Sequence, residues 1–286
     1  MSRIAIIPIV FMSLVLCACS GGGGAGRVKP ADPDLVTRVV EEHNARVDRI
    51  DTFWARVSVR VRGLDARGER FEEQGEGHLQ IVAPDRASLT VGKLGETYFA
   101  YGANEDRYWM FDLSDSDHRA ALVGDLSRVT RAKAHTLGLS IHPSDLVGAV
   151  GLERIDLERI EDARIEDGML VLETPARWGS SSWWFTLDPM ELRWVVSSDE
   201  QGTELARTEL SQYKALLESN RFPTGVEVPG QVEITTPGDE DGYVRIELSD
   251  TTRKAIRGVV YDFDRLSRMY RVSEVIDLDT DPRVNP

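Results

Sequence analysis

Residues 53–81 read FWARVSVRVRGLDARGERFEEQGEGHLQI, and this stretch decides the fold. In its first half, Val57, Val59 and Val61 occupy every second position, with serine or arginine between them. The second half alternates in the same way. Because successive side chains of a β-strand point to opposite faces, a period of two predicts two strands, each buried on one face. We expect the two strands to pair across a turn at 63–68.

The two predicted strands carry opposite charges on their outward faces. Arginines alternate along the first strand and glutamates along the second, so pairing places an arginine-rich face beside a glutamate-rich one. Gly75 and Gly77 lie on the inward face of the second strand. Glycines in such positions indicate that the sheet bends sharply there or that another element packs closely.

A helix is predicted before the first strand. Asp32 is a suitable N-cap, and Pro33 follows it in the first helical position. Apolar residues then recur at helical spacing, with charged residues between them, which predicts one amphipathic helix from about Asp34 to Arg49. We interpret His43 as a residue at the margin of its buried stripe and not as a ligand. The stripe consists of Val36, Val39, Val40, His43, Val47 and Ile50.

Many short strands of the same kind are predicted after the first pair, joined by Gly, Pro and Asp turns. The segment 114–152 loses the alternation, and within it Pro143 to Gly151 is typical of a short capped helix. This pattern predicts a mainly β fold with a single antiparallel sheet large enough to curl, and with two helical parts left to cover one face. The further predicted strands are 86–91, 96–102, 107–112, 169–174, 181–187, 191–198, 204–214, 226–236 and 243–249, and extended chain is expected at 259–263 and 270–278.

The first residues are typical of an exported lipoprotein. Arg3 supplies a positive start, and residues 4–16 form an almost unbroken apolar run that is too short to span a bilayer as a mature helix. Leu16-Cys17-Ala18-Cys19 matches a lipobox, with a branched apolar residue three positions before the cysteine and a small one directly before it. We therefore predict a signal peptide at 1–18. The alternatives are an ordinary secretory signal cut nearby and an uncleaved anchor.

Cys19 is the predicted lipidation site. In bacterial lipoproteins, which this N-terminus resembles, the cysteine receives a diacylglycerol thioether and often an N-acyl chain such as palmitate. Each buried methylene contributes about 0.8 kcal/mol, so two or three chains anchor a protein stably. Ser20 stands where many lipoproteins retained in the inner membrane have aspartate, which favours the outer membrane, facing the periplasm. A Gly-rich tether at 19–31 then leads to one β domain at 32–286, in which 255–286 is an extension without an assigned role.

The composition excludes several other classes of function. The chain has 34 Lys and Arg against 48 Asp and Glu, a formal net charge of -14, which repels the phosphates of nucleic acid. Both cysteines lie in the signal and lipobox, so the body has no disulfide and no cysteine metal site. We expect no cofactor other than the covalent lipid on Cys19.

The order of these parts resembles the LolA and LolB family of lipoprotein-localisation factors, from about Asp34 to Ser249. The resemblance implies an unclosed, strongly curved antiparallel half-barrel whose concave side is capped by helices and whose hollow receives acyl chains. The lipobox makes the chain more similar to LolB, an outer-membrane lipoprotein, than to the soluble carrier LolA. The matching parts are the leading helix, the strand 54–62, the strand ending at 79–82 before Pro-Asp-Arg at 84–86, the paired strands 97–101 and 107–111, the helix 145–152 and Phe-Pro-Thr-Gly-Val at 222–226.

Aromatic residues on successive strands are the candidate walls of such a hollow. An apolar ligand needs large side chains around it and few polar groups. Trp183 and Trp184 are adjacent and cannot both point inward from a regular strand. The alternative is that the aromatic residues fill a closed core. The expected ligand-binding residues are Phe99, Tyr101, Trp109, Phe111, Trp184 and Trp194, with Trp183 and Phe185 as further wall candidates.

Catalytic and metal motifs are weak. Ser211 and Lys214 have the serine-x-x-lysine spacing of penicillin-binding enzymes, but they lie in a strand-like run without the companion motifs. Asp277, Asp279 and Asp281 imitate the start of a calcium loop that lacks its glycine and its closing glutamate. Solvated or capping roles are expected for the three histidines of the central insert, which are His118, His135 and His142.

These observations predict a non-enzymatic protein of the cell envelope that binds a lipid, the acyl chains of lipoproteins or another apolar molecule. One alternative is an adaptor or structural lipoprotein with a filled core, whose protein partner the sequence does not identify. The other is an envelope hydrolase.

Overall fold

The computed structural model describes residues 28–64, 69–137, 141–218, 222–237 and 242–282. The signal peptide, Cys19 and most of the tether lie outside these residues. No helix within the described ranges is long and apolar enough to cross a membrane. The helices are α1 (Pro33–Val47), η1 (Leu126–Arg128), α2 (Arg131–Thr136), η2 (Pro143–Asp145), α3 (Leu146–Ala149), η3 (Leu157–Arg159), η4 (Gly258–Tyr261) and α4 (Phe263–Tyr270).

The strands form one large sheet. They are β1 (Lys29–Pro30), β2 (Thr52–Leu64), β3 (Arg70–Val82), β4 (Arg86–Lys93), β5 (Glu96–Ala103), β6 (Arg107–Asp112), β7 (Ala120–Asp125), β8 (Asp162–Glu166), β9 (Met169–Ala176), β10 (Gly179–Phe185), β11 (Leu192–Asp199), β12 (Glu204–Ser211), β13 (Lys214–Glu218), β14 (Phe222–Val228), β15 (Gln231–Thr235), β16 (Tyr243–Arg253) and β17 (Glu274–Asp277). The prediction of a mainly β fold is confirmed.

The pairing of the strands shows that the sheet is open. From one edge to the other the strands run β1, β8, β9, β10, β11, β12, β15, β16, β2, β3, β4, β5, β6, β7 and β17. All of these pairs are antiparallel except that of β17 with β7. The hairpin β13–β14 joins the sheet through a parallel pairing of β13 with β16.

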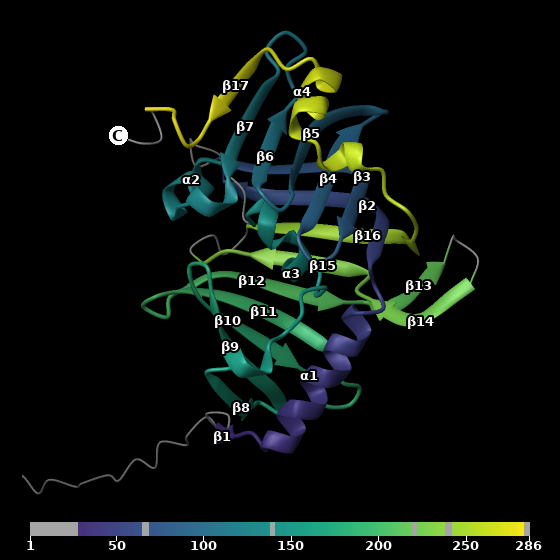
Figure 1. The fold of residues 1–286 in the computed structure, drawn as a ribbon, viewed down its shortest axis with the longest axis vertical. Coiled ribbons are helices and arrows are strands. Elements are labelled where there is room, and N and C mark those ends of the chain that lie inside the picture. The colour runs from purple at the N-terminus through teal and green to yellow at the C-terminus, as the bar shows by residue number, and fades with distance from the viewer. Residues whose placement is uncertain (1–27, 65–68, 138–140, 219–221, 238–241, 283–286) are drawn as a thin grey trace, which may run out of the picture.

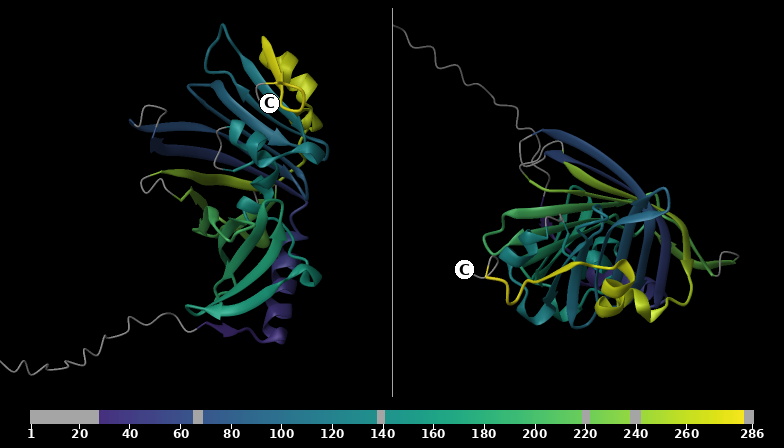
Figure 2. Two further views of the ribbon diagram at one scale, coloured as in Figure 1. Left: turned by 90° about the vertical axis from the view of Figure 1, so that its left-hand side faces the viewer. Right: turned by 90° about the horizontal axis from the view of Figure 1, so that it is seen from above.

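The sheet curves strongly, and its two edges lie at opposite ends of the molecule (Figures 1 and 2). We call β2 to β7 with β17 the upper wing, and β1 with β8 to β12 the lower wing, as they lie in Figure 1. β15 and β16 connect the two wings. The structure is therefore the predicted half-open, curved antiparallel sheet and not a closed barrel.

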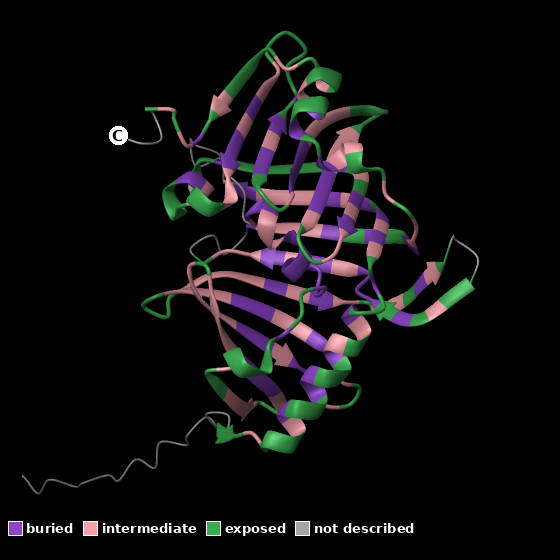
Figure 3. Cartoon of the chain, viewed as in Figure 1, coloured by how far each residue is buried: buried purple, intermediate pink, exposed green. Residues whose placement is uncertain are grey.

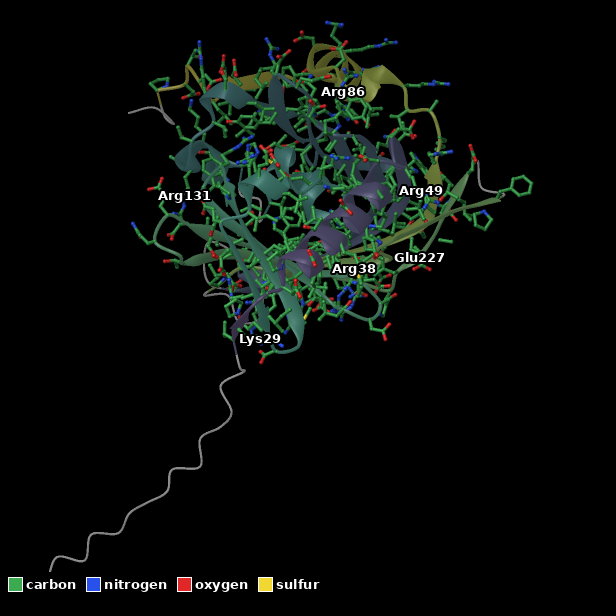
Figure 4. All side chains as sticks on the ribbon, turned by 60° about the horizontal axis from the view of Figure 1, so that its bottom comes forward. Lys29, Arg38, Arg49, Arg86, Arg131 and Glu227 are labelled. Carbon is green, nitrogen blue, oxygen red and sulfur yellow. The ribbon has the colours of Figure 1, made fainter. Side chains whose placement is uncertain are left out.

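Helix α1 forms as the sequence predicts. The side chain of Asp32 accepts a hydrogen bond from the backbone amide of Asp34 at 2.9 Å, and Pro33 occupies the first turn. The apolar stripe, with His43, is buried, while Arg38 lies on the exposed side of the helix, and Arg49, in the turn that follows the helix, is also exposed (Figure 4). α1 therefore covers the sheet with one face and leaves the other in solvent.

The hairpin of β2 and β3 sets the curvature of the upper wing. Arg60 and Glu72 lie 3.6 Å apart on its outward face, which confirms the expected meeting of arginines and glutamates. A Cβ placed on Gly77 would overlap the backbone carbonyl of Thr90 on β4. The glycine therefore permits the close approach of β3 to β4, as its inward position predicted.

The central insert contains more strand than its sequence suggests. The short helix predicted before Gly151 is present as η2 and α3, and Gly151 has a φ of +69°, which glycine adopts readily. The structure also places β7 and β8 in segments without clear alternation. β7 is buried between two layers, so apolar residues occur on both of its faces and the alternation disappears.

Two predicted long strands are each broken in two. The predicted strand 204–214 becomes β12 and β13, and 226–236 is divided between β14 and β15. Gln212, between β12 and β13, has a φ of +55°, and the amide of Gly230 donates to the carbonyls of Ser211 and Gln212 at 3.0 and 3.1 Å. These bonds turn the chain out of the sheet and back, and the hairpin β13–β14 projects from the body (Figure 1).

The end of the chain covers the outward face of the upper wing. The prediction of extended chain at 259–263 is wrong, because η4 and α4 occupy this region, whereas 270–278 contains the short strand β17. Figure 3 shows buried positions on α4 where it meets the strands. Residues 254–278 therefore form a strap that closes a second apolar core. We call it the outer core, and its buried members are Ala100, Trp109, Phe111, Leu113, Ala121, Val123, Tyr261, Phe263 and Leu266.

Candidate functional site

The inward faces of the two wings share one apolar core. Its buried members include Val57 and Leu89 from the upper wing and Leu172 and Phe185 from the lower wing. Side chains from strands so far apart in the sheet can meet only if the sheet curves toward this face. We call this concave side the inner face and the opposite side the outer face.

Helices α1 and α3 fill much of the inner face. Val40 of α1 is 0% exposed and Leu146 of α3 is 1% exposed, and both belong to the shared core. η2 contacts β4, β5 and β6, while α1 contacts β10 through the rings of His43 and Phe185, whose centroids lie 5.5 Å apart. The inner face is therefore closed over much of its area by the protein's own side chains.

Three polar side chains of α1 fix the segment that follows α3. His43 Nε2 lies 2.8 Å from the carbonyl oxygen of Glu153, and Arg46 donates to the carbonyl of Gly151 at 2.7 Å. Asn44 donates to the carbonyl of Ile155 at 2.8 Å and accepts from its amide at 2.9 Å. Buried backbone groups that leave regular structure need such partners, so α1 holds the central insert in place.

The charge state of His43 follows from these neighbours. Burial, followed by the charge of the Arg46 guanidinium, lowers the pKa of the imidazole to about 4. His43 Nδ1 lies 3.3 Å from a guanidinium nitrogen of Arg46, which is always a donor. Nδ1 must therefore accept, and the proton of the neutral ring lies on Nε2, where it can be donated to Glu153.

One part of the inner face remains partly exposed. We call it the inner strip, and its members lie on β2, β4, β5, β6 and β16 and pack against the shared core. Cross-strand pairs connect them, and the Phe99 ring lies 5.3 Å from that of Tyr101, the direct partner of Met110. The inner strip consists of Val61, Val91, Phe99, Met110 and Val244.

Gly75 makes the inner strip continuous across β3. A Cβ on Gly75 would overlap Cγ1 of Val91, so the valine side chain lies in the space that a larger residue would occupy. Charged residues are the direct cross-strand partners of two strip members: Glu73, opposite Val61, forms an exposed ion pair with Lys93 at 2.8 Å, and Asp112 is the exposed partner of Phe99. The inner strip therefore has a filled core on one side and a charged rim on the other.

No protein-family model and no curated protein matches the sequence. Solved structures do match. A DUF1329 family protein from Desulfovibrio piger is 10% identical, covers 82% of this chain and 100% of that chain, and has a TM-score of 0.53. A candidate outer membrane lipoprotein-sorting protein domain from Vibrio parahaemolyticus is 13% identical, with 82% and 97% covered and a TM-score of 0.52. The fold is LolA-like. A LolA superfamily protein from Nitrosomonas europaea is 12% identical, with 79% and 98% covered and a TM-score of 0.49.

The LolA-like fold separates the expected wall residues of the upper wing. Phe99 and Tyr101 lie on the inner face, in or beside the inner strip. Trp109 and Phe111 are 0% exposed in a different cluster on the outer face, where the Phe111 ring stacks on Phe263 of α4 at 5.4 Å. The four residues therefore do not line one surface, and a ligand-binding role for each of them stays a prediction.

The lower wing shows the same division. Trp183 and Phe185 point to the inner face, where they are 4% and 1% exposed within the shared core. Trp184 and Trp194 are cross-strand partners on the outer face, with ring centroids 5.8 Å apart. The structure therefore brings these two tryptophans together, but on the face opposite the one where we expected them.

Loop length explains the misplacement of Trp109 and Phe111. A turn confined to 104–106 would pair Ala103 with Arg107, which would place Tyr101 and Trp109 on one face. The structure pairs Ala103 with Tyr108, because Asn104 Oδ1 accepts from the amides of both Asp106 and Arg107 and extends the loop by one residue. A shift of one residue moves every following side chain to the other face. The signal that sequence reasoning missed was the asparagine at the start of the loop.

The weaker motifs have structural roles in the described residues. Ser211 ends strand β12, and Lys214 donates to the carbonyl of Leu248, so the pair does not form a helical catalytic motif. Asp279 accepts from Lys133 at 2.6 Å and from the amide of Asp125 at 2.7 Å, which occupies both of its carboxylate oxygens. No cluster that could hold a metal ion is present among the described residues.

The histidines of the insert behave as predicted where their side chains are described. His118 is 88% exposed near Asp115. His142 caps η2 by accepting from the amide of Ser144, and burial, followed by the charge of Arg177, lowers its pKa to about 3. Neither histidine has the surroundings of a metal ligand.

Proposed function

We propose that this chain is a lipoprotein of the bacterial envelope that holds an apolar ligand, either a lipid or the acyl chain of a lipoprotein, on the inner strip. The observation that carries the proposal is the strip itself, a set of apolar side chains on neighbouring strands left partly exposed on the concave face of a LolA-like fold. The similar domain from Vibrio parahaemolyticus is described as an outer membrane lipoprotein-sorting domain, which agrees with the proposal. Apolar side chains of this kind can bind a ligand but supply no group for catalysis.

The proposed anchor is the lipid on Cys19. Residues 19–29 span about 35 Å when fully extended, so the tether would hold the edge strand β1 within that distance of the membrane. The proposed location is the outer membrane, facing the periplasm. Metabolic labelling with an alkyne fatty acid tests the anchor: we expect label on the natural chain and none on Cys19→Ala. Label retained by the alanine variant would refute lipidation at this residue.

Binding of an uncharged, environment-sensitive dye such as Nile red tests the ligand site. We expect the mature chain without its lipidated cysteine, a form that begins at Ser20 and retains residues 28–282, to bind one dye molecule. Val244→Asp places an unpaired charge in the inner strip and should weaken binding at least tenfold, since burying such a charge costs several kcal/mol. Val275→Asp is the matched control, because Val275 is 52% exposed on β17 and pairs with Ala121 of the cluster on the opposite face of the sheet.

Circular dichroism of both variants separates binding from folding. Equal loss of dye binding in both variants, or an unchanged affinity in Val244→Asp, would contradict a site on the inner strip. Failure of the natural chain to bind dye or lipid would favour the second candidate, a non-enzymatic adaptor. The observation behind that candidate is the filling of the inner face by α1 and α3.

A further inference from the structure

The depth of the inner strip limits what it can hold. The shared core lies directly beside it, and its nearest members are almost completely covered: Val57 is 1% exposed, Leu89 2% and Ile246 2%. Interiors of proteins are close-packed, so no second layer of ligand atoms fits beneath the strip without displacing these side chains. Any ligand must therefore lie along the surface of the strip.

The width of the strip is set by charge. On the side away from the core lie the carboxylate of Glu73, the ammonium of Lys93 and the carboxylate of Asp112, all exposed. Laying hydrocarbon over these groups would remove water from them without supplying hydrogen bonds, which is unfavourable. The apolar surface is accordingly about one side chain wide.

The length of the strip suits an acyl chain. From Val244 on β16 to Met110 on β6 it crosses β2, β3, β4 and β5, which makes five inter-strand spacings. At about 4.8 Å each these amount to about 24 Å along the curve. A surface of this length and width accommodates one extended hydrocarbon chain.

We infer that the inner strip takes an amphiphile with a single acyl chain, and that a triacylated lipoprotein N-terminus gains nothing from its other two chains. This inference rests on the proposed function and narrows its ligand. The Glu73–Lys93 pair, in which the two opposite charges balance, flanks the middle of the chain, and the polar end of the amphiphile would lie at the β6 end, where the carboxylate of Asp112 is exposed. A headgroup without net charge therefore fits the rim better than an anionic one.

Displacement of Nile red from the mature chain tests the inference, with every competitor kept below its critical micelle concentration. The competitors are lysophosphatidylcholines of increasing chain length, palmitate, and a water-soluble triacylated lipopeptide with palmitoyl chains. We expect one-to-one displacement by lysophosphatidylcholine, up to about fourfold tighter for each added methylene. Palmitate should bind more weakly than the lysophospholipid of equal chain length, which separates a free fatty acid from a phospholipid source.

The affinity of the triacylated lipopeptide distinguishes binding of one acyl chain from binding of all three. We expect it to bind within about threefold of the lysophospholipid with the same chain, because two of its chains remain in water. Binding that is a hundredfold tighter or more, with all three chains protected, would overturn the single-chain inference while leaving the proposed function standing. Dye that no competitor displaces would instead refute the proposed function.

Discussion

Acidification should destabilise the protein through His43. The ring is 5% exposed, contacts Trp183 and Phe185, and has its two nitrogens committed to Glu153 and Arg46. A second proton on the ring would turn the 3.3 Å contact of Nδ1 with the Arg46 guanidinium from a hydrogen bond into a repulsion between two cations. The folded state therefore resists protonation that the unfolded chain accepts.

The size of the effect follows from the two pKa values. The pKa is 6.5 in the unfolded chain and is lowered to about 4 in the fold, first by burial and then by Arg46. Between these values the unfolded state binds more protons, so the free energy of unfolding falls as the pH falls. The fall is about 2 kcal/mol between pH 7 and pH 5 and levels off near about 3 kcal/mol below pH 4.

Urea-induced unfolding of the natural chain and of His43→Gln measures this effect. Glutamine can donate to Glu153 but cannot titrate, so the variant should lose about 2 kcal/mol less than the natural chain between pH 7 and pH 5. His142, with its pKa near 3, also destabilises the fold in acid, whereas burial raises the pKa of Asp145 and of Glu153 and acts in the opposite sense. These groups are present in both proteins and cancel in the comparison. Equal pH dependence in the two proteins would refute the reasoning.

Two further predictions concern the C-terminal strap and Asp279, the residue that follows it. Leu266→Ala should lower the free energy of unfolding by about 2 to 5 kcal/mol, because Leu266 is 4% exposed in the outer core. Met269→Ala on the same helix, where the side chain is 57% exposed, should change it by less than about 0.5 kcal/mol, and similar urea midpoints for the two variants would contradict the packing of α4. Asp279→Ala should cost about 3 to 5 kcal/mol, because it leaves the ammonium of Lys133, 8% exposed, without its carboxylate. Replacing Lys133 by methionine as well should recover part of this loss, and no recovery would contradict a charge effect.

Alternation predicted β2 and β3 well because each has one buried face. The strands predicted at 86–91, 96–102 and 107–112 correspond to β4, β5 and β6, although β5 and β6 are buried on both faces and their aromatic residues could not be assigned to a face. The signal is weaker still in β7 and β17. β7 lies between the outer core and the insert, and β17 joins it only because residues far along the chain return to its edge.

The candidate site was harder to predict than the strands, because a site depends on which face each residue occupies. Sequence reasoning identified Phe99 and Tyr101, which lie on the inner face, but it could not place Trp109 without the register set by the Asn104 loop. The outer face is covered in part by α4, and the sequence pattern predicted extended chain where this helix begins. The pairing register of the strands and the packing of a distant helix on the sheet are tertiary properties. The local periodicity of the sequence does not determine them.

The distribution of aromatic residues bears on the kind of ligand that the inner face can select. Trp109 and Phe111 are committed to the strap, and Trp184 and Trp194 to each other on the outer face, so Phe99 is the aromatic member of an otherwise aliphatic inner strip. A planar, rigid ligand gains specificity from stacking geometry with aromatic rings, which the strip offers at one position. A flexible hydrocarbon chain gains from the burial of apolar surface, and that gain has no directional requirement. The strip therefore favours a flexible chain over a polycyclic ligand of equal apolar area. The reason is that the fold places the other aromatic residues on the outer face, where they cannot stack on a ligand of the strip.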